Sequence, residues 1–334
     1  MRLRAALLAL AVSLFASGAP PGSECATCHP AETRSHQSTK MARAMMLALV
    51  SAFAENLPDA PLHESSDGYS FVYRRVENGI GVTALRGGAR ADGVIEWVLG
   101  AGVQGQTPLV RTERGVLESR VSYFPQLHQY GITIGQEAGA SPNAEAALGV
   151  KQNARDLRNC IVCHSTGITS DLQPVIPGVQ CERCHEGAEE HARGRGKPPF
   201  NPGKVSAPEQ VRFCGNCHRV KAPLDDAQLE NFRFQPLRLM KSRCFASGKL
   251  SCTTCHPAHQ DARRNDPTFY NGKCHACHDS QTFHADRRAQ GDCIGCHMPY
   301  VQLHPALNFT DHFIRVVKAG DLPESIVRRR AAGS

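Results

Sequence analysis

Cysteine and histidine recur at one fixed spacing along this chain. A Cys-x-x-Cys-His motif occurs seven times and uses 14 of the 15 cysteines and seven of the 16 histidines. The copies are Cys25-Cys28-His29, Cys160-Cys163-His164, Cys181-Cys184-His185, Cys214-Cys217-His218, Cys252-Cys255-His256, Cys274-Cys277-His278 and Cys293-Cys296-His297. This spacing is typical of c-type heme attachment, in which two thiols form thioethers with one porphyrin and the adjacent histidine binds the iron. We therefore expect seven covalently attached hemes of the c type.

Zinc binding and disulfide formation are the alternatives to heme attachment. Cys-x-x-Cys pairs build zinc ribbons, and disulfides suit an exported protein. Neither requires a histidine directly after the second cysteine, and all seven copies have one. The motif therefore favours heme over both.

A short basic and apolar N-terminus precedes the first motif. Arg2 and Arg4 are followed by an apolar run from Ala5 to Ala16 and then by small residues. This pattern is typical of a cleaved signal peptide, which we assign to residues 1–19, and an uncleaved anchor is the alternative. We expect export to the periplasm or the extracellular side, because heme is attached to this motif outside the cytoplasm.

The formal net charge of +7 does not indicate a nucleic-acid partner. Loss of Arg2 and Arg4 with the signal peptide leaves +5. Each heme adds two propionates and, when ferric, one positive charge, so the holoprotein carries about −2 when oxidised and about −9 when reduced. This charge gives nucleic-acid binding little support. The basic residues Arg328 to Arg330 form either a docking patch or a solvated chain end.

The motifs are unevenly distributed and suggest how the chain is organised. We expect a first heme segment at 20–50, a β-rich heme-poor region at 51–156, a six-heme domain at 157–315 and a basic C-terminal tail at 316–334. The first segment is predicted to be mostly helical after His29. The Gly- and Pro-rich intervals in the six-heme domain predict short helices and loops.

A small antiparallel β unit is predicted at about 65–125. Alternating apolar and polar residues flank Asn78-Gly79, which is a strong hairpin signal, and a second turn is predicted near Arg114-Gly115. The fold class expected is a multiheme cytochrome c, with short helices and loops wrapped around stacked hemes and a small antiparallel β unit beside them.

Nine histidines lie outside the motifs and supply candidates for the second axial ligands. Seven hemes need at most seven such ligands, so bis-histidine ligation throughout is possible. We predict ligand roles for His36, His128, His191, His259, His284, His304 and His312. The weaker candidates are His63, in a polar loop, and His275, inside its own attachment loop. For each, a surface or propionate-binding histidine is the alternative.

His259 follows the proximal His256 by three residues, within about 11 Å of extended chain. The two axial ligands lie on opposite faces of a porphyrin, so the macrocycle blocks His259 from the heme of its own motif. We expect His259 to bind the iron of a neighbouring heme. The same argument applies with less force to His36, His191 and His284. Such cross-ligation would pack hemes closely and favours a chain of hemes.

Two other sulfur residues bear on the chemistry. Cys244 lies outside the motifs and is interpreted as a buried or capped thiol, or alternatively as a thiolate active beside an incompletely ligated heme. A methionine ligand would raise the heme potential, but Met298 directly follows His297 and cannot reach the opposite face of that heme. We therefore expect low-potential bis-histidine hemes.

Several segments resemble a known group of cytochromes. CATCHPAETRSHQST, VQCERCHEGAEEH, LSCTTCHPAH, DCIGCHMP and FTDHFI are similar to segments of the multiheme cytochromes c related to the nitrifiers' tetraheme cytochrome. That superfamily includes pentaheme nitrite reductase and octaheme hydroxylamine oxidoreductase. The resemblance covers the first heme segment and most of 159–315. It implies stacked bis-histidine heme pairs, with His36, His191, His259 and His312 as second ligands.

The sequence departs from this group at one point that bears on catalysis. The nitrite reductases usually carry lysine in place of histidine at the catalytic heme, whereas all seven motifs here end in histidine. None of the six tyrosines is assigned the cross-link of the hydroxylamine enzyme.

Three hypotheses of function follow from the motifs. The first is an exported heptaheme cytochrome that relays electrons between other redox proteins without substrate turnover of its own. The second is an oxidoreductase acting on a small nitrogen or sulfur compound at one open heme. The third is a subunit of an extracellular heme filament or an outer-membrane conduit, in which a histidine from another subunit binds a heme.

Overall fold

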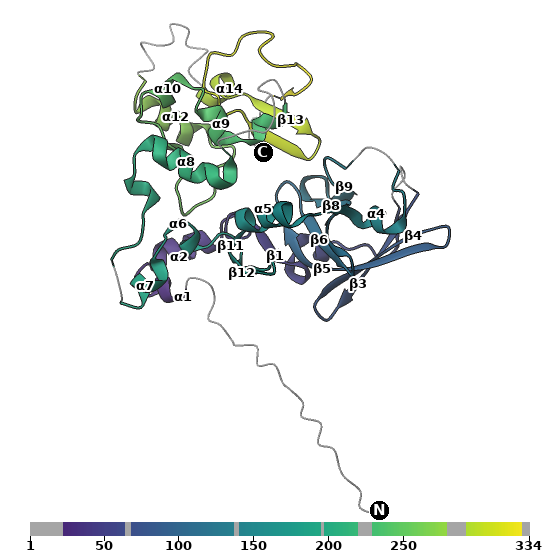
Figure 1. The fold of residues 1–334 in the computed structure, drawn as a ribbon. Coiled ribbons are helices and arrows are strands. Elements are labelled where there is room, and N and C mark those ends of the chain that lie inside the picture. Colours follow the sequence, from purple (N-terminus) through teal and green to yellow (C-terminus); the bar gives the residue numbers. More distant parts are fainter. Residues whose placement is uncertain are drawn as a thin grey trace, which may run out of the picture.

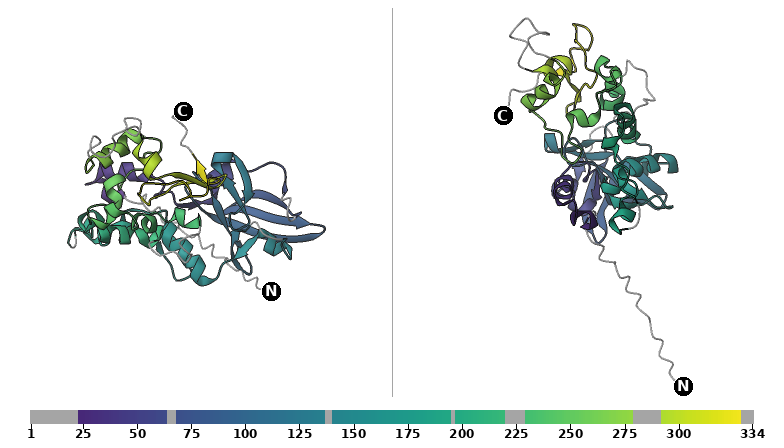
Figure 2. Two further views of the ribbon diagram at one scale, coloured as in Figure 1. Left: turned by 90° about the horizontal axis from the view of Figure 1, so that it is seen from above. Right: turned by 90° about the vertical axis from the view of Figure 1, so that its left-hand side faces the viewer.

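The computed structural model describes residues 23–63, 68–136, 140–194, 197–219, 229–278 and 292–328. The assigned signal peptide, His284 and Arg329-Arg330 lie outside the described residues. An antiparallel sheet forms one end of the molecule and short helices form the other (Figure 1 and Figure 2). None of the helices in these ranges combines the length and the apolar character needed to cross a bilayer.

The main sheet has eight strands and is antiparallel throughout. Its strand order is β10-β7-β6-β5-β4-β3-β2, and β1 also pairs with β5. The strands are β1 (Met45–Leu47), β2 (Leu62–His63), β3 (Ser70–Val76), β4 (Gly79–Arg86), β5 (Ala89–Leu99), β6 (Thr107–Thr112), β7 (Gly115–Ser119) and β10 (Gly149–Lys151). A two-stranded sheet of β8 (Val121–Phe124) and β9 (Gln129–Ile132) follows β7, with the 3-10 turn η2 (Pro125–Leu127) between them.

The two predicted turns are confirmed. Val76 pairs with Gly79 across the β3–β4 hairpin, so the turn consists of Glu77 and Asn78. Thr112 pairs with Gly115 across the β6–β7 hairpin. The sheet extends beyond the predicted 65–125, because β1 and β10 join it from outside that range.

The core of the sheet is a continuous apolar cluster. Phe53, Phe71, Ile80, Ile95 and Val98 are at most 1% exposed. The short helices α3 (Ala52–Glu55) and α4 (Ala144–Leu148) contribute to the same cluster. Burial of each large apolar side chain contributes about 1.5–3 kcal/mol relative to exposure, so this cluster holds the sheet without a cofactor.

The first heme segment is less helical than predicted. Helix α1 (Ser23–Ala26) is followed by α2 (Pro30–Gln37), and the chain then turns into strand β1. Thr39 ends α2, because its hydroxyl donates to His36 O at 2.7 Å and accepts from Ala42 N at 3.1 Å. Met45 is buried, and it lies on strand β1, where it pairs with Leu99.

Short helices dominate the second half of the chain, as predicted. They are α5 (Ala154–His164), α6 (Cys181–Cys184), α7 (Ala188–Ala192), α8 (Ala207–His218), α9 (Gln235–Leu239), α10 (Arg243–Ala246), α11 (Cys252–Cys255), α12 (Pro267–His275) and α14 (Cys293–His297), with 3-10 turns η3 (Pro202–Lys204) and η4 (Leu229–Arg233). One small sheet joins β11 (Ser165–Ile168) to β12 (Pro174–Pro177). Another has β13 (Tyr300–His304) as its central strand, paired with β14 (Leu307–Thr310) on one side and β15 (Val327–Arg328) on the other. The β13–β14 hairpin contacts the sheet end, where Gln104 and Gln126 hydrogen-bond Asn308.

Candidate heme cavity

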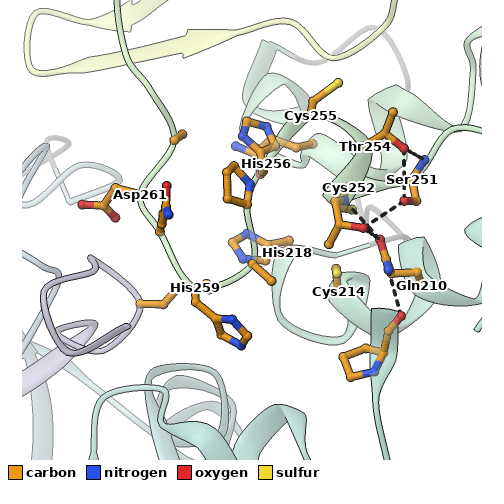
Figure 3. Close-up of a pocket in the computed structure, with 18 of the residues that line it drawn as sticks. Gln210, Cys214, His218, Ser251, Cys252, Thr254, Cys255, His256, His259 and Asp261 are labelled. Atoms are coloured by element: carbon orange, nitrogen blue, oxygen red, sulfur yellow. Dashed lines mark hydrogen bonds between the residues drawn. The ribbon is translucent and has the colours of Figure 1, made fainter. Parts of the chain in front are cut away.

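One continuous cavity of about 2870 Å³ lies among the helices and reaches the sheet end. At least two residues from every one of the seven Cys-x-x-Cys-His motifs line it. Figure 3 shows one part of it, where His218 and His256 lie near each other and Cys214 and Cys252 lie beside them. The fold therefore directs all seven motifs into one shared space.

Each motif forms a helical turn that places its three functional side chains on one face. The backbone NH of the histidine donates to the carbonyl of the first cysteine four residues earlier, at 2.8 Å in the motifs of His29 and His185 and 2.9 Å in those of His256 and His278. Side chains at positions i, i+3 and i+4 of a helix share a face. This geometry presents two thiols and one imidazole to the same side, as one porphyrin requires.

Thiols of different motifs lie side by side. The thiols of four pairs lie close enough to affect one another's pKa: Cys25 with Cys181, Cys163 with Cys217, Cys214 with Cys252, and Cys274 with Cys293. None of the 15 cysteines, all of which are described, forms a disulfide. The motif of Cys214 and Cys217 is thus in direct contact with the second and fifth motifs.

Arg183 and Gln210 fix the relative positions of neighbouring motifs. Arg183 donates to Val162 O at 3.3 Å and lies 4.0 Å from the thiol of Cys217. A hydrogen bond from Cys163, together with the charge of Arg183, lowers the pKa of Cys217. The buried Gln210 accepts from Thr253 N at 3.1 Å and donates to Pro202 O at 2.8 Å (Figure 3). Gln210 lies on α8 and Thr253 on α11, so their hydrogen bond joins the two helices.

Three pairs of imidazole rings have centroids about 6 Å apart, a separation at which both rings of a pair could bind one iron. The ring centroids of His185 and His259 are 6.1 Å apart, those of His256 and His312 6.2 Å, and those of His36 and His259 6.4 Å. An imidazole nitrogen lies about 2 Å from a bound metal ion, so two imidazoles on opposite sides of one iron have centroids about 6 Å apart. His259 belongs to two of these pairs, so it lies between His36 of the first heme segment and His185 of the third motif.

Backbone carbonyls hold four of the imidazoles that line the cavity in an orientation that suits a metal ligand. The Nδ1 atoms of His164, His185, His297 and His312 lie 2.9–3.0 Å from the carbonyl oxygens of Ala44, Phe200, Arg315 and Thr310 respectively. A donor bond from Nδ1 leaves the Nε2 lone pair free, which is the arrangement found in metal-ligating histidines.

Burial favours the neutral form of five histidines that line the cavity. It lowers the pKa of His164, His218, His256 and His259, and it lowers the pKa of His312 to about 4, with His256 adding to the effect. The neutral imidazole is the form that binds a metal ion. The donor set therefore carries free lone pairs at neutral pH.

Two buried imidazole nitrogens have no hydrogen-bond partner among the described residues: His36 Nδ1 and His256 Nδ1. His36 directs its other nitrogen, Nε2, to Val179 O at 2.8 Å. A buried polar atom without a partner is costly, and at His36 a bound metal would satisfy it. Heme groups held by these residues would fit three observations: the paired imidazoles, the unpartnered Nδ1 of His36 and the cavity that all seven motifs share.

The remaining predicted ligands differ in where they lie. His191, on α7, lines the cavity with an exposed side chain. His128 is exposed at the end of η2, and His304, on β13, accepts from Ala306 N and packs 5.7 Å from the Phe124 ring, so neither belongs to the cavity lining. His284 lies outside the described residues. Among the weaker candidates, His275 lines the cavity, and His63 is exposed beside Ser70.

Cys244 also lines the cavity, at helix α10. Its thiol interacts with those of Cys255, Cys274 and Cys277, which belong to the fifth and sixth motifs. Burial raises the pKa of Cys244, so the thiol is protonated at neutral pH.

A buried ion cluster beside His312 was not predicted from the sequence. Asp311 is fully buried and accepts hydrogen bonds from Arg238 and Arg315. Burial alone would raise the pKa of Asp311, but the bonds from Arg238, Phe313 NH and Arg315 lower it overall. The FTDHFI segment contains Asp311, but Arg238 lies 73 residues earlier and carries no local signal.

Comparison with known proteins supports the same cofactor. Residues 127–186 match the family described as Cytochrome c554 and c-prime. The chain is 23% identical over 194 residues to Multiheme cytochrome MtrA from Shewanella baltica (strain OS185), a match that covers 48% of this chain and 53% of that protein. The two matches support a multiheme c-type cytochrome with covalently bound heme. The chain spans about half the length of that relative, and no solved structure matches it significantly.

Proposed function

We propose that this chain is an exported heptaheme c-type cytochrome that relays electrons between other redox proteins. The observation that carries the proposal is the single cavity lined by all seven attachment motifs. The hemes supply the one-electron redox change when bound, and the protein supplies attachment, orientation and electrostatics. Fourteen cysteines would hold the seven groups, and the seven motif histidines would bind their irons.

Besides attaching the hemes, the chain would complete the coordination of their irons and exclude water. His36, His259 and His312 face other cavity imidazoles and are the best-placed second ligands. The neutral state of the buried imidazoles keeps them ready to bind. Low-potential bis-histidine hemes would follow, because histidine ligands favour lower potentials than methionine.

The proposed partners are an electron donor and an electron acceptor, both redox proteins. The proposal includes a periplasmic or extracellular position and assembly into an outer-membrane complex or a heme-mediated oligomer. The partial match to a protein named Multiheme cytochrome MtrA supports the multiheme cytochrome part of it. We retain the division into a signal peptide, a first heme segment, a β-rich region, a six-heme domain and a basic tail as part of this proposal. A nucleic-acid partner is not part of it.

The test is heme counting followed by low-temperature EPR of the oxidised holoprotein. Intact mass should give seven attached hemes per chain, and EPR should show low-spin ferric signals alone. A mass with fewer hemes would contradict the heptaheme assignment. A complete set of low-spin hemes with no reactivity toward small nitrogen or sulfur compounds would support a relay protein.

A second function is favoured by one specific observation. Among the described residues, five histidines outside the motifs line the cavity, namely His36, His191, His259, His275 and His312. Seven hemes would need seven second ligands, so an open iron would suit an oxidoreductase acting on a small nitrogen or sulfur compound. A high-spin EPR signal of about one heme per chain, with turnover of such a compound, would favour this function over the relay. A low-spin signal that depends on oligomer formation would favour a filament or conduit.

A further inference from the structure

Asp311 is the centre of a buried ion cluster at the edge of the cavity. Its carboxylate is 0% exposed and accepts from Arg238 Nε at 2.8 Å and from a second guanidinium nitrogen of Arg238 at 2.7 Å. Arg315 donates to the same carboxylate at 2.7 Å, and its side chain is 15% exposed. A two-pronged Arg–carboxylate pair fixes direction as well as distance. Asp311 therefore ties helix α9 rigidly to the segment that follows β14.

Hydrogen bonds of the Asp311 side chain and backbone hold the chain on both sides of His312. Asp311 Oδ1 accepts from Phe313 N at 3.0 Å, and Asp311 N donates to Pro299 O at 2.9 Å. Ser242 accepts from Ile314 N at 2.8 Å a little further along the chain. His312 thus projects from a backbone that is anchored before and after it.

The position of His312 depends on this anchoring. Its Nδ1 donates to Thr310 O at 2.9 Å, and its ring lies 6.2 Å from that of His256 in the fifth motif. The anchored segment belongs to a different part of the chain from the helix that carries His256. Only the tertiary contacts of this segment bring the two rings to the axial-ligand distance.

The cluster reaches a second motif through Arg315. The carbonyl of Arg315 accepts from His297 Nδ1 at 2.9 Å, and Arg315 N donates to His297 O at 3.2 Å. A hydrogen bond at the outer nitrogen of a metal-binding histidine orients the ring and raises its basicity as a ligand. Asp311, which holds the Arg315 side chain, is therefore coupled to both the fifth and the seventh motif.

We propose that Asp311 is a positioning residue for two heme sites: it holds His312 as the second ligand opposite His256, and it holds Arg315 against the proximal His297. This inference rests on the proposed heme attachment. It assigns the buried ion cluster a role in spin state and potential in addition to its role in folding.

The test compares D311N with H312A in the heme-loaded protein. D311N keeps the size of the side chain but removes the charge that holds the two arginines. We expect both variants to carry the wild-type heme number by mass and to show about one new high-spin heme per chain by EPR. Added imidazole should return that heme to low spin in both variants. The double variant D311N/H312A should show no second high-spin heme, because Asp311 acts through His312 at this site.

A redox titration supplies the readout for the second site. H312A should change one component of the titration, whereas D311N should change two, because it also alters the hydrogen bond at His297. V82A is the matched control, since Val82 is buried in the sheet core and its truncation destabilises the protein away from the cavity. V82A should leave all hemes in their wild-type spin states.

The outcomes separate this inference from the proposed function. Wild-type protein with fewer hemes than motifs would contradict the heptaheme proposal itself. Seven hemes in wild type, with D311N entirely low-spin and titrating as wild type, would overturn the role of Asp311 alone. If D311N yields no holoprotein, D311E is used, because it keeps the charge but displaces it by one methylene. A partial high-spin fraction in D311E supports the inference, and a wild-type spectrum and titration overturn it.

Discussion

At the scale of single residues, His36 has a buried side-chain nitrogen that a metal ion could bind. Its Nε2 lies 2.8 Å from Val179 O, and its buried Nδ1 has no partner among the described residues. We expect His36 to bind iron through Nδ1, so H36A should convert about one heme from low to high spin in EPR. H63A is the control, because His63 is an exposed histidine outside the cavity lining. An H36A spectrum identical to wild type would rule out this ligand role.

Glu118 is a residue of the sheet whose charge is unfavourable when buried. Burial raises the pKa of Glu118, and only the hydrogen bond from Gln136 Nε2, at 3.2 Å, opposes this. A carboxyl group whose folded pKa lies above its unfolded pKa favours the folded state at low pH, and this contribution is lost as pH rises through the folded pKa.

The E118Q variant tests this linkage. Glutamine keeps an oxygen that accepts from Gln136 but carries no charge, so E118Q should raise the thermal midpoint by a few degrees at pH 7. The difference from wild type should shrink toward pH 4, where Glu118 becomes protonated in both states. Thermal unfolding followed by far-UV circular dichroism at the two pH values measures the effect. Equal midpoints at pH 7 would contradict the prediction.

Among the elements, the β11–β12 hairpin is what holds the first heme segment in place. Gly178, just after β12, has φ +76°, and a Cβ there would lie 1.9 Å from Ala42 O. The next two residues bind the same segment, because Val179 O accepts from His36 Nε2 and Gln180 Nε2 donates to Ala42 O at 3.1 Å. Only glycine permits this approach of the two backbones.

The G178A variant should therefore disturb both stability and heme ligation. We expect a loss of about 1–3 kcal/mol of stability, together with a high-spin signal from the heme that His36 would bind. G88A is the matched control, since Gly88, in the turn between β4 and β5, has φ +87° and a Cβ there would meet no other atom within 4 Å. G88A should cost about 1–2 kcal/mol from backbone strain alone and leave the EPR spectrum unchanged. Equal spectra for the two variants would contradict the prediction.

The elements that the sequence predicts well are those specified by local residues. Asn78 and Arg114 lie in the two turns, and Gly79 and Gly115 directly follow them, so both hairpins are predictable from short stretches of sequence. The sequence predicts a helix where strand β1 lies, because its apolar residues suit either structure and its pairing with β5 spans more than 40 residues. Pairing between strands that are distant in the chain produces no periodic pattern in the local sequence.

At the scale of the whole molecule, the motifs indicate the cofactor but not the spatial order of the sites. The Cys-x-x-Cys-His spacing is a local requirement of one porphyrin, so sequence alone reveals every candidate attachment point. The contacts Cys25 with Cys181 and Cys163 with Cys217 join distant parts of the chain. The buried Arg238–Asp311 pair is likewise a tertiary feature, which explains why sequence patterns do not reveal it.

The two halves of the molecule are held together by different means. The sheet has a continuous apolar core, whereas the helices surround a cavity of about 2870 Å³ and have smaller apolar clusters. Without hemes this space would fill with water, and the short helices around it would have few apolar contacts with one another. We therefore expect hemes to form the interior of the helical half.

This difference predicts how the chain behaves without heme. Chain produced without heme attachment should retain sheet signal in far-UV circular dichroism but lose the fixed structure of the helical half. Limited proteolysis with mass spectrometry should then cut first within 157–315 and leave 68–136 protected, because that range contains most of the apolar core. The heme-loaded protein under the same protease is the control and should resist cleavage in both regions. Equal protection of the two regions without heme would show that the helical half folds independently of its cofactor.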